Sequence, residues 1–332
     1  MAQAPARCER HIHFSRFRSL SSLQTYYKWE IYGSKFVDVL NKPYQIAIAS
    51  NMIIDFHTHI FPKDIRENRE KYFPSEPAFR LLYDSPKSKL VGAKEIVAAM
   101  DDQGVDRSVV FGFPWKNSDI FKPQNDYIMA AVARFPDRLI GLCCFDPFSK
   151  AAASEARRCL EGGLAGIGEI AFYQSGIDEA VLDKLAPLME ICLDKDLPFL
   201  IHTNEPVGHM YPGKTPNTLK QIDALAVRFS ENKIVLAHWG AGIFFFNLLK
   251  KEIKDHLKNV YFDTAASPFL YHPQIYRYAV EIAGGDKILF GSDFPLIQPA
   301  RYFDELKKTS GLSKAQIESI CGANAAKLLN LL

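Results

Sequence analysis

The feature that most constrains the fold is a repeat that begins at Met52, in which short apolar runs alternate with longer helical patterns. The runs are five to seven residues long and rich in β-branched and aromatic side chains. Such runs, separated by helical patterns, are typical of parallel strands connected by helices. The expected strands are 52–57, 105–111, 139–145, 165–170, 198–202, 233–238, 259–263 and 287–292.

Helical patterns fill the intervals between these runs. The expected helices are 93–103, 125–135, 150–161, 179–195, 218–229, 271–283, 301–308 and 313–329, the last with Ser313 as its N-cap. Eight strands with intervening helices over about 280 residues fit a closed (β/α)8 TIM barrel better than a doubly wound sheet, which rarely needs eight strands. We therefore predict one α/β domain, a (β/α)8 barrel, over residues 52–332.

Residues 1–51 differ from the rest of the chain, because basic residues outnumber acidic ones and no run resembles a strand. Their Arg and Ser content is similar to that of an organellar transit peptide, but Glu9, Glu30 and the missing amphipathic period argue against one. We expect an N-terminal extension that is either disordered or the product of a misassigned start, since Met52 stands directly before the first strand.

Composition and charge exclude several classes of protein. A hydrophobic content of 48% excludes a disordered chain, and 40 basic against 38 acidic residues, without long blocks of one sign, make nucleic acid an unexpected partner. The apolar stretch 243–249 is too short for a membrane helix, which needs about 20 residues. The six cysteines form no CxxC pair, which favours the reducing cytoplasm. A small-molecule substrate is the expected partner, and a homodimer is the protein assembly to test.

The expected strands end in ionisable residues. The first leads into Asp55, His57 and His59, and the later ones lead to Glu169, His202, His238, Asp263 and Asp293. Active sites of (β/α)8 barrels lie at the carboxyl ends of the strands, so we expect these side chains to face one centre. Side chains alternate along a strand, so His57 and His59 share a face with Asp55, which becomes either a deeper ligand or a residue that orients one.

Each of these residues, taken alone, is more often a cap or a hydrogen-bonded loop residue than a ligand. Their joint occurrence is different, because every buried charge needs a partner. Imidazole and carboxylate groups suit a catalytic divalent ion that keeps open positions for water and substrate. The pattern therefore predicts a catalytic metal centre.

Four strings of residues carry a family resemblance: IIDFHTH at 53–59, LIH at 200–202, VLAH at 235–238 and FGSDFP at 290–295. With them, residues 52 to about 330 resemble the amidohydrolase superfamily, and most of all its amidohydrolase-related branch. That branch includes metal-dependent hydrolases, and also decarboxylases and hydratases such as aminocarboxymuconate semialdehyde decarboxylase.

The resemblance implies roles for individual residues. His57, His59 and His202 become metal ligands, and Asp293 becomes a ligand that also handles the proton of an attacking water. His238 has two implied roles, as an acid, base or electrostatic aid beside a single ion, or as a ligand of a second ion.

Glu169 departs from the single-ion pattern. Its Gly-Glu-Ile context is similar to the strand-four carboxylate that bridges two metals in TatD-like nucleases. We favour a centre with two ions, and a single ion with Glu169 outside the ligand set remains open. Zinc is the metal expected first, although Mn, Fe, Ni and Co accept the same ligands.

Substrate recognition is expected from the long loops 60–92 and 203–216 that follow two of the strands. In the second loop, His209 and Lys214 could bind an anionic group, or the prolines around them could hold solvated polar residues in a rigid turn. Trp239, next to His238, is the best-placed aromatic residue for an apolar substrate, unless it packs a helix on the barrel.

The leading functional hypothesis is a hydrolase that uses a metal-activated water on a small-molecule ester, amide, lactone or related bond. The alternative is a metal-dependent decarboxylase or hydratase, a lyase acting on an unsaturated or aromatic carboxylic acid. A cleft lysine or arginine that contacts a substrate carboxylate would favour the lyase, and a second metal position would favour the hydrolase. A non-catalytic metal-binding barrel is the third hypothesis, which a replaced ligand would have favoured.

Overall fold

Each of the eight predicted runs overlaps a strand in the computed structural model, which describes residues 52–308 and 311–331. The predicted extension 1–51 lies outside these described residues. The strands are β1 (Ile54–His59), β2 (Arg107–Phe111), β3 (Leu139–Gly141), β4 (Ile167–Ile170), β5 (Phe199–Ile201), β6 (Ile234–Leu236), β7 (Val260–Asp263) and β8 (Ile288–Leu289). Most strands are shorter than the predicted runs. Some lose the first residues of the run, as β2, β4 and β7 do, and others lose mainly the last ones, as β3 and β8 do.

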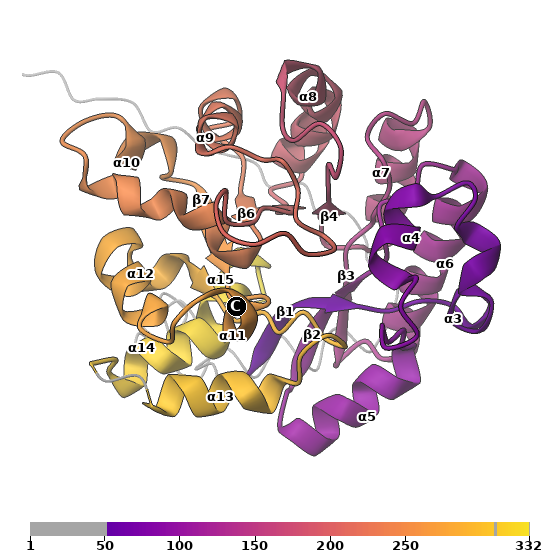
Figure 1. The fold of residues 1–332 in the computed structure, drawn as a ribbon. Coiled ribbons are helices and arrows are strands. Elements are labelled where there is room, and N and C mark those ends of the chain that lie inside the picture. Colours follow the sequence, from indigo (N-terminus) through magenta and orange to yellow (C-terminus); the bar gives the residue numbers. More distant parts are fainter. Residues whose placement is uncertain (1–51, 309–310, 332) are drawn as a thin grey trace, which may run out of the picture. The chain divides into compact units, whose positions relative to one another are not determined.

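All neighbouring strands are parallel, in a sheet of order β1-β2-β3 and a sheet of order β4-β5-β6-β7-β8. Backbone hydrogen bonds join the two sheets at both junctions. The Cys143 N–H donates to Gly166 O at 3.1 Å near β3 and β4, and the Phe56 N–H donates to Phe290 O at 2.7 Å between β1 and β8. The strands thus follow one another around a (β/α)8 barrel, as the sequence predicts (Figure 1).

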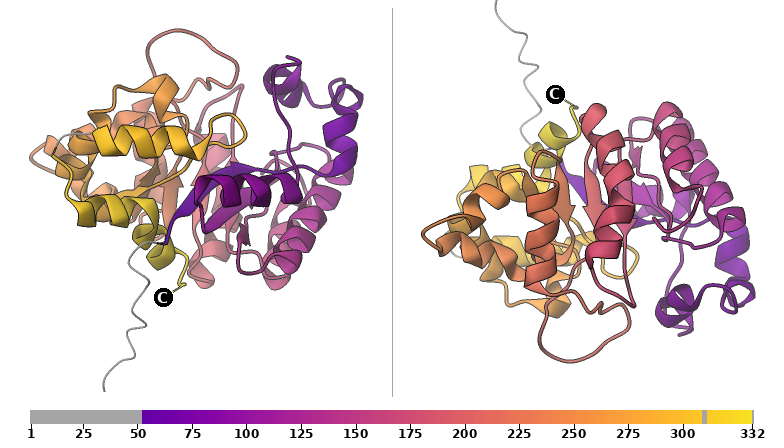
Figure 2. Two further views of the ribbon diagram at one scale, coloured as in Figure 1. Left: turned by 90° about the horizontal axis from the view of Figure 1, so that it is seen from below. Right: turned by 90° about the horizontal axis from the view of Figure 1, so that it is seen from above.

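The main helices lie outside the strands in both views of Figure 2. Each overlaps a predicted segment, but the helix expected at 125–135 begins at Ser118, and the one expected at 313–329 is interrupted by a π-helical turn at Ser319–Ala323. The Ser313 hydroxyl accepts the Gln316 N–H, which confirms the predicted N-cap. The helices are α5 (Ala93–Gln103), α6 (Ser118–Arg134), α7 (Ala152–Glu161), α8 (Glu179–Asp194), α9 (Leu219–Arg228), α12 (Ile275–Ala283), α13 (Pro299–Lys308), α14 (Lys314–Glu318) and α15 (Asn324–Leu328). None of the described helices is both long enough and apolar enough to cross a membrane.

Several elements were not predicted. Most carry too few residues for a helical period, and the longest, His238–Leu248, has left-handed φ angles at residues 239–242 that break such a period. They occupy the loops after β1, β6 and β7, the approach to β8 and the end of α14. These elements are α3 (Lys63–Glu67), η1 (Arg69–Tyr72), α4 (Pro77–Tyr83), η2 (His238–Leu248), α10 (Ile253–His256), α11 (Ser267–Leu270), η3 (Gly285–Lys287) and η4 (Ser319–Ala323).

The buried side chains form an inner and an outer cluster, as expected for strands that face a barrel interior on one side and helices on the other. Phe56 and Phe111 belong to the inner cluster, where α15 closes the end at which the strands begin. There the Asn324 side-chain amide donates to Gly285 O and Ile288 O at 2.7 and 2.8 Å. The opposite end of the barrel is left for the functional residues.

Candidate active site

Six predicted ligands meet at the carboxyl ends of the strands. His57 and His59 come from β1, Glu169 from β4, and the other three follow β5, β6 and β8. Three overlapping groups of these side chains have ligand atoms within 4.8 Å of one another. The groups are His57, His238 and Asp293; His57, His59 and Glu169; and Glu169, His202 and His238. We call these six residues the ligand cluster.

His57 lies at the centre of the ligand cluster and is completely buried. Its Nδ1 lies 2.8 Å from Asp263 Oδ2, which fixes the ring. Its Nε2 is buried without a hydrogen-bond partner, at 3.7 Å from Glu169 Oε2 and 3.8 Å from Asp293 Oδ1. A buried polar atom without a partner is costly, so this nitrogen fits a metal ligand.

The other histidines are oriented in two ways. The Nδ1 atoms of His59 and His238 lie 3.1 Å from Gly112 O and 3.0 Å from Ala265 O, so each can donate a proton to a carbonyl and keep a lone pair on Nε2. The Nδ1 of His202 instead lies 2.9 Å from Glu169 Oε1, and its Nε2 is buried without a partner. All three rings therefore have a nitrogen available to a cation.

The charge balance of the ligand cluster also favours a cation. Burial raises the pKa of Glu169, but the charges of His57 and His202 outweigh it and hold that pKa well below its ordinary value. Burial also opposes ionisation of Asp293, whose pKa is nevertheless lowered, mainly by its hydrogen bond with His59. Burial lowers the pKa of His57, yet Asp263 and Glu169 raise it to about 10. Protons hold this positive charge in the metal-free protein, and a divalent ion can replace them.

Two further aspartates support the ligand cluster. Asp263 Oδ1 accepts the backbone N–H groups of His238 and Ala265 at 2.9 and 3.0 Å, while its other oxygen holds His57. Asp55 accepts the backbone N–H of Ser292 at 2.8 Å and also its hydroxyl, so it fixes the turn before Asp293. Of its two predicted roles, Asp55 therefore fits that of an orienting residue. From the sequence, Asp263 was identified only as the residue that ends a strand, and its role in orienting His57 was not predicted.

The backbone around the ligand cluster adopts left-handed conformations that non-glycine residues rarely take. The φ angles are 54° at His238, 56° at Ala266 and 62° at Asp293. The Asp293 N–H donates to His57 O at 2.9 Å, which holds this unusual turn against β1. Such strain is commonly found at functional sites.

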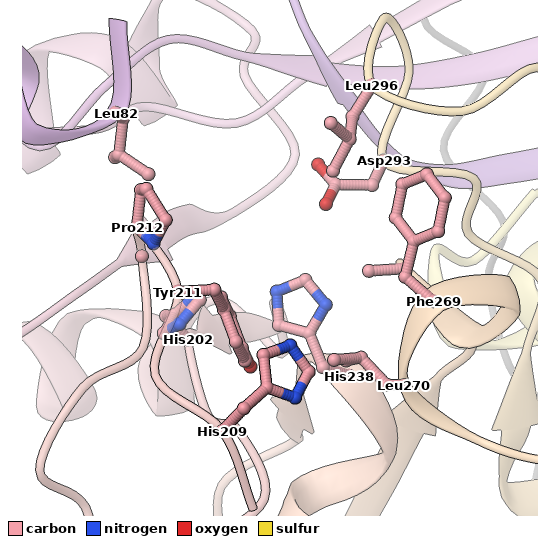
Figure 3. A pocket seen from close by; sticks show the side chains of 12 residues that line it. Leu82, His202, His209, Tyr211, Pro212, His238, Phe269, Leu270, Asp293 and Leu296 are labelled. Atoms are coloured by element: carbon pink, nitrogen blue, oxygen red, sulfur yellow. The ribbon is translucent and has the colours of Figure 1, made fainter.

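A cavity with two lobes opens over the ligand cluster, and His202, His238 and Asp293 line both lobes. The first, which we call the polar lobe, has a volume of about 420 Å³ and is also lined by His59, Tyr83, Lys87, Lys89, Phe113 and Tyr173. The second, the apolar lobe, has a volume of about 470 Å³ and is also lined by Leu82, His209, Tyr211, Phe269, Leu270 and Leu296. Figure 3 shows His209, His238 and Asp293 around the apolar lobe.

The predicted substrate-binding residues are not all brought together. His209 lines the apolar lobe. The ammonium of Lys214 is used inside its own loop, because it donates to Glu205 Oε1 at 2.9 Å and to the carbonyl oxygens of Val207 and His209 at 2.6 and 3.1 Å.

Trp239 is not among the residues that line either lobe. Its indole is fully buried and donates to Ser267 Oγ at 2.9 Å, and its ring lies 5.2 Å from that of Tyr276. This position corresponds to the packing alternative considered for Trp239. The polar-lobe residues Tyr83, Lys87, Lys89 and Tyr173 were not selected from the sequence, because their loops carry no periodic signal.

Comparison with known proteins agrees with this fold. A family model described as amidohydrolase matches residues 54–331. The protein therefore belongs to the amidohydrolase family, as the sequence strings indicated.

The names of individual relatives are more specific than that of the family. The chain is 26% identical to a 2-amino-3-carboxymuconate-6-semialdehyde decarboxylase of Dictyostelium discoideum, over 84% of this chain and 91% of the relative. Its fold is similar to that of 5-carboxyvanillate decarboxylase from Sphingomonas paucimobilis, with a TM-score of 0.67 and 19% identity over 84% of this chain and 99% of the other.

A third relative is a dihydroxybenzoic acid decarboxylase from Polaromonas sp. JS666, solved with bound manganese and the inhibitor 2-nitroresorcinol. It has a TM-score of 0.63 and 19% identity, over 85% of this chain and 97% of the other. These relatives match the predicted lyase alternative better than the leading hydrolase hypothesis.

Proposed function

We propose that this protein is a metal-dependent decarboxylase that acts on a small unsaturated or aromatic carboxylic acid. The observation that carries the proposal is the polar lobe beside the ligand cluster. Lys87 and Lys89 line it, and neither forms an ion pair with any residue in the described ranges. Unpaired lysines next to a cation centre provide two positive sites for an acid.

The walls of the polar lobe suit a planar substrate. The rings of Phe113 and Tyr173 are nearly parallel, with 9° between their planes and 6.2 Å between their centres. Burial, with smaller contributions from Asp293 and Glu169, raises the pKa of the Tyr83 hydroxyl, so this group stays protonated and can donate a hydrogen bond. A flat aromatic or conjugated acid would contact the rings with its face and the hydroxyl with an oxygen.

The ligand cluster fits a divalent ion, held by His57, His59 and Asp293 with further contacts available from Glu169, His202 and His238. When bound, such an ion would polarise a substrate oxygen and offset negative charge. Zinc is the metal expected from the sequence, and the manganese in the Polaromonas relative makes manganese an equal candidate.

Asp293 is the proposed group for the proton transfer, with His238 beside it. Its lowered pKa makes it a carboxylate before the reaction, so it would first take a proton from solvent or from a substrate hydroxyl and then pass that proton to the reacting carbon. Its side chain is only 14% exposed, its Oδ1 lies 3.4 Å from His59 Nε2, and it lines both lobes. In the reaction, the carbon that carries the carboxylate gains a proton, its bond to the carboxyl carbon breaks, and carbon dioxide leaves. The electron pair of the broken bond stays with the substrate, and solvent returns the proton to Asp293.

The experiment incubates the protein, loaded with zinc or manganese, with aromatic and unsaturated acids in D₂O and measures released carbon dioxide. A decarboxylase places one deuterium on the carbon that lost the carboxylate, which mass spectrometry of the product detects. A parallel set of esters and lactones tests hydrolysis. Release of acid from that set, without carbon dioxide from the first, would overturn the proposal.

Hydrolysis is the second candidate, because two of the ligand groups share Glu169 and could place two ions on either side of it. Elemental analysis of the protein and of Glu169→Gln distinguishes the arrangements. Two equivalents that fall to one would identify Glu169 as a bridge and favour hydrolysis. One equivalent in both proteins would place Glu169 outside the ligand set and favour decarboxylation.

We also propose the cytoplasm as the compartment. The five cysteines among the described residues are all free and buried, as expected for a protein kept in reducing conditions.

A further inference from the structure

We infer that the apolar lobe binds a non-polar arm of the substrate, so that the preferred acid carries an alkyl or aryl substituent. This inference rests on the proposed function and specifies its substrate class. The two lobes share His202, His238 and Asp293, so a molecule whose reacting carbon lies at the ligand cluster can extend into both.

The chemistry of the two lobes differs. Leu82 and Leu296 line both lobes. The polar lobe adds two lysines and two tyrosines, whereas the apolar lobe adds Pro212, Phe269 and Leu270. The hydroxyl of Tyr211 already donates to Glu205 Oε2 at 2.8 Å. A carboxylate therefore gains more binding free energy in the polar lobe, and a hydrocarbon group gains more in the apolar lobe.

The lining of the apolar lobe leaves apolar surface exposed. Phe269 is 55% exposed and Leu296 is 61% exposed, although both border a cavity beside a buried centre. Covering such apolar surface stabilises a complex. Figure 3 shows these two side chains on the same side of the lobe as Asp293.

The opposite wall is held in place by its own loop. Residues 203–216, which we call the roof loop, are fixed by the buried pair of Lys214 and Glu205 and by bonds between Asn204 and Thr215 at 2.6 and 2.7 Å. Gly213, at a φ of 96°, comes so near α4 that an added Cβ would lie 3.0 Å from Leu82 Cδ2. The lobe therefore has a preformed shape, which reduces the entropy that binding costs.

His209 marks the polar end of the apolar lobe. Its ring lies 5.6 Å from that of Tyr211, and its nitrogens form no hydrogen bond with the residues that the structure describes. An arm that ends in a hydroxyl or carbonyl can therefore bond to this imidazole.

The test uses 2,6-dihydroxybenzoate and its homologues with a methyl, propyl or pentyl chain on carbon 3 or carbon 4. Calorimetry measures binding to the metal-loaded protein, and carbon dioxide release is measured in parallel. We expect affinity to rise about fourfold per methylene along one of the two series, the gain for a buried CH₂. Affinity that is flat or falls in both series would overturn the inference.

Two matched variants test the location of the arm. Phe269→Ser should reduce the gain to less than about twofold per methylene. Phe246→Ser, a change at a phenylalanine that is 41% exposed and lines neither lobe, should leave it intact. A gain that survives Phe269→Ser would overturn the inference. If no acid releases carbon dioxide, the proposed function fails, while the binding series still decides the question of the arm.

Discussion

The ligand cluster and the roof loop lie on either side of the same cavity but are held in different ways. The ligand cluster is positioned by residues distant in sequence, such as Asp263 for His57 and Gly112 for His59. The roof loop is positioned mainly by contacts within itself, such as Lys214 with Glu205. The first arrangement depends on barrel register, and the second depends on pairing inside one loop. We expect chemistry to depend on the first and substrate preference on the second.

Replacing Asp293 should have the largest effect. Asp293→Asn removes the proposed proton donor, so turnover should fall by about 10²- to 10⁴-fold while circular dichroism stays unchanged. The measurement is carbon dioxide release at equal metal content. Asp286→Asn, at an exposed aspartate away from the cavity, is the matched control. Retained activity in Asp293→Asn would exclude the proton role.

The next effect concerns Asp263, which touches the ligand cluster only through His57 and the backbone of His238. Asp263→Asn should weaken metal affinity by about 10- to 100-fold, because the orienting carboxylate loses its charge. Competition with a fluorescent chelator measures the affinity, with the exposed Asp255→Asn as control. Equal affinities in both variants would contradict the orienting role.

The pH dependence of the metal-free protein should be smaller but distinctive. The pKa of His57 is raised from 6.5 to about 10, so its contribution to stability is complete below pH 6.5 and is lost as the pH rises towards 10. The free energy of unfolding should therefore fall between pH 7 and 9, by up to about 1.4 kcal/mol per pH unit. Urea unfolding of chelated protein measures it. His57→Asn should lose this slope, and an unchanged slope would assign it to other groups.

A change in the roof loop should have the smallest effect. Lys214→Met removes the three bonds that the ammonium donates, so the wall of the apolar lobe should loosen and KM should rise by a few-fold, with kcat nearly unchanged. Lys220→Met, at an exposed lysine in α9, is the control. A large loss of kcat would mean that the roof loop takes part in the chemistry.

The same contrast explains what could be predicted from the sequence. The eight strands and the convergence of His57, His202 and Asp293 follow from periodicity and from the rule that barrel sites lie at strand ends. Neither periodicity nor the strand-end rule predicts the surroundings of Trp239 and Lys214. Trp239 is buried in a left-handed turn, and Lys214 forms a salt bridge within its own loop. The lysines of the polar lobe are placed by a loop whose short helices give no periodic signal.

The alternation of side chains along β1 was also only partly predictable. In a perfectly alternating strand, the adjacent side chains of Phe56 and His57 would point to opposite faces of the sheet. Phe56 nevertheless belongs to the inner cluster, and His57 lies in the ligand cluster at the end of the same barrel. The register between β1 and β2 shifts between Asp55 and Thr58, which allows this change. A register shift of this kind depends on the pairing with the neighbouring strand and leaves no mark in the composition of the run.

The contact between β1 and the residues that follow β8 has a consequence for biosynthesis. The bond from the Asp293 N–H to His57 O joins β1 to the turn that follows β8. A growing chain carries His57 and His59 long before Asp293 leaves the ribosome. The ligand cluster is complete only once the turn after β8 has docked on β1, so we expect tight metal binding only in the folded barrel.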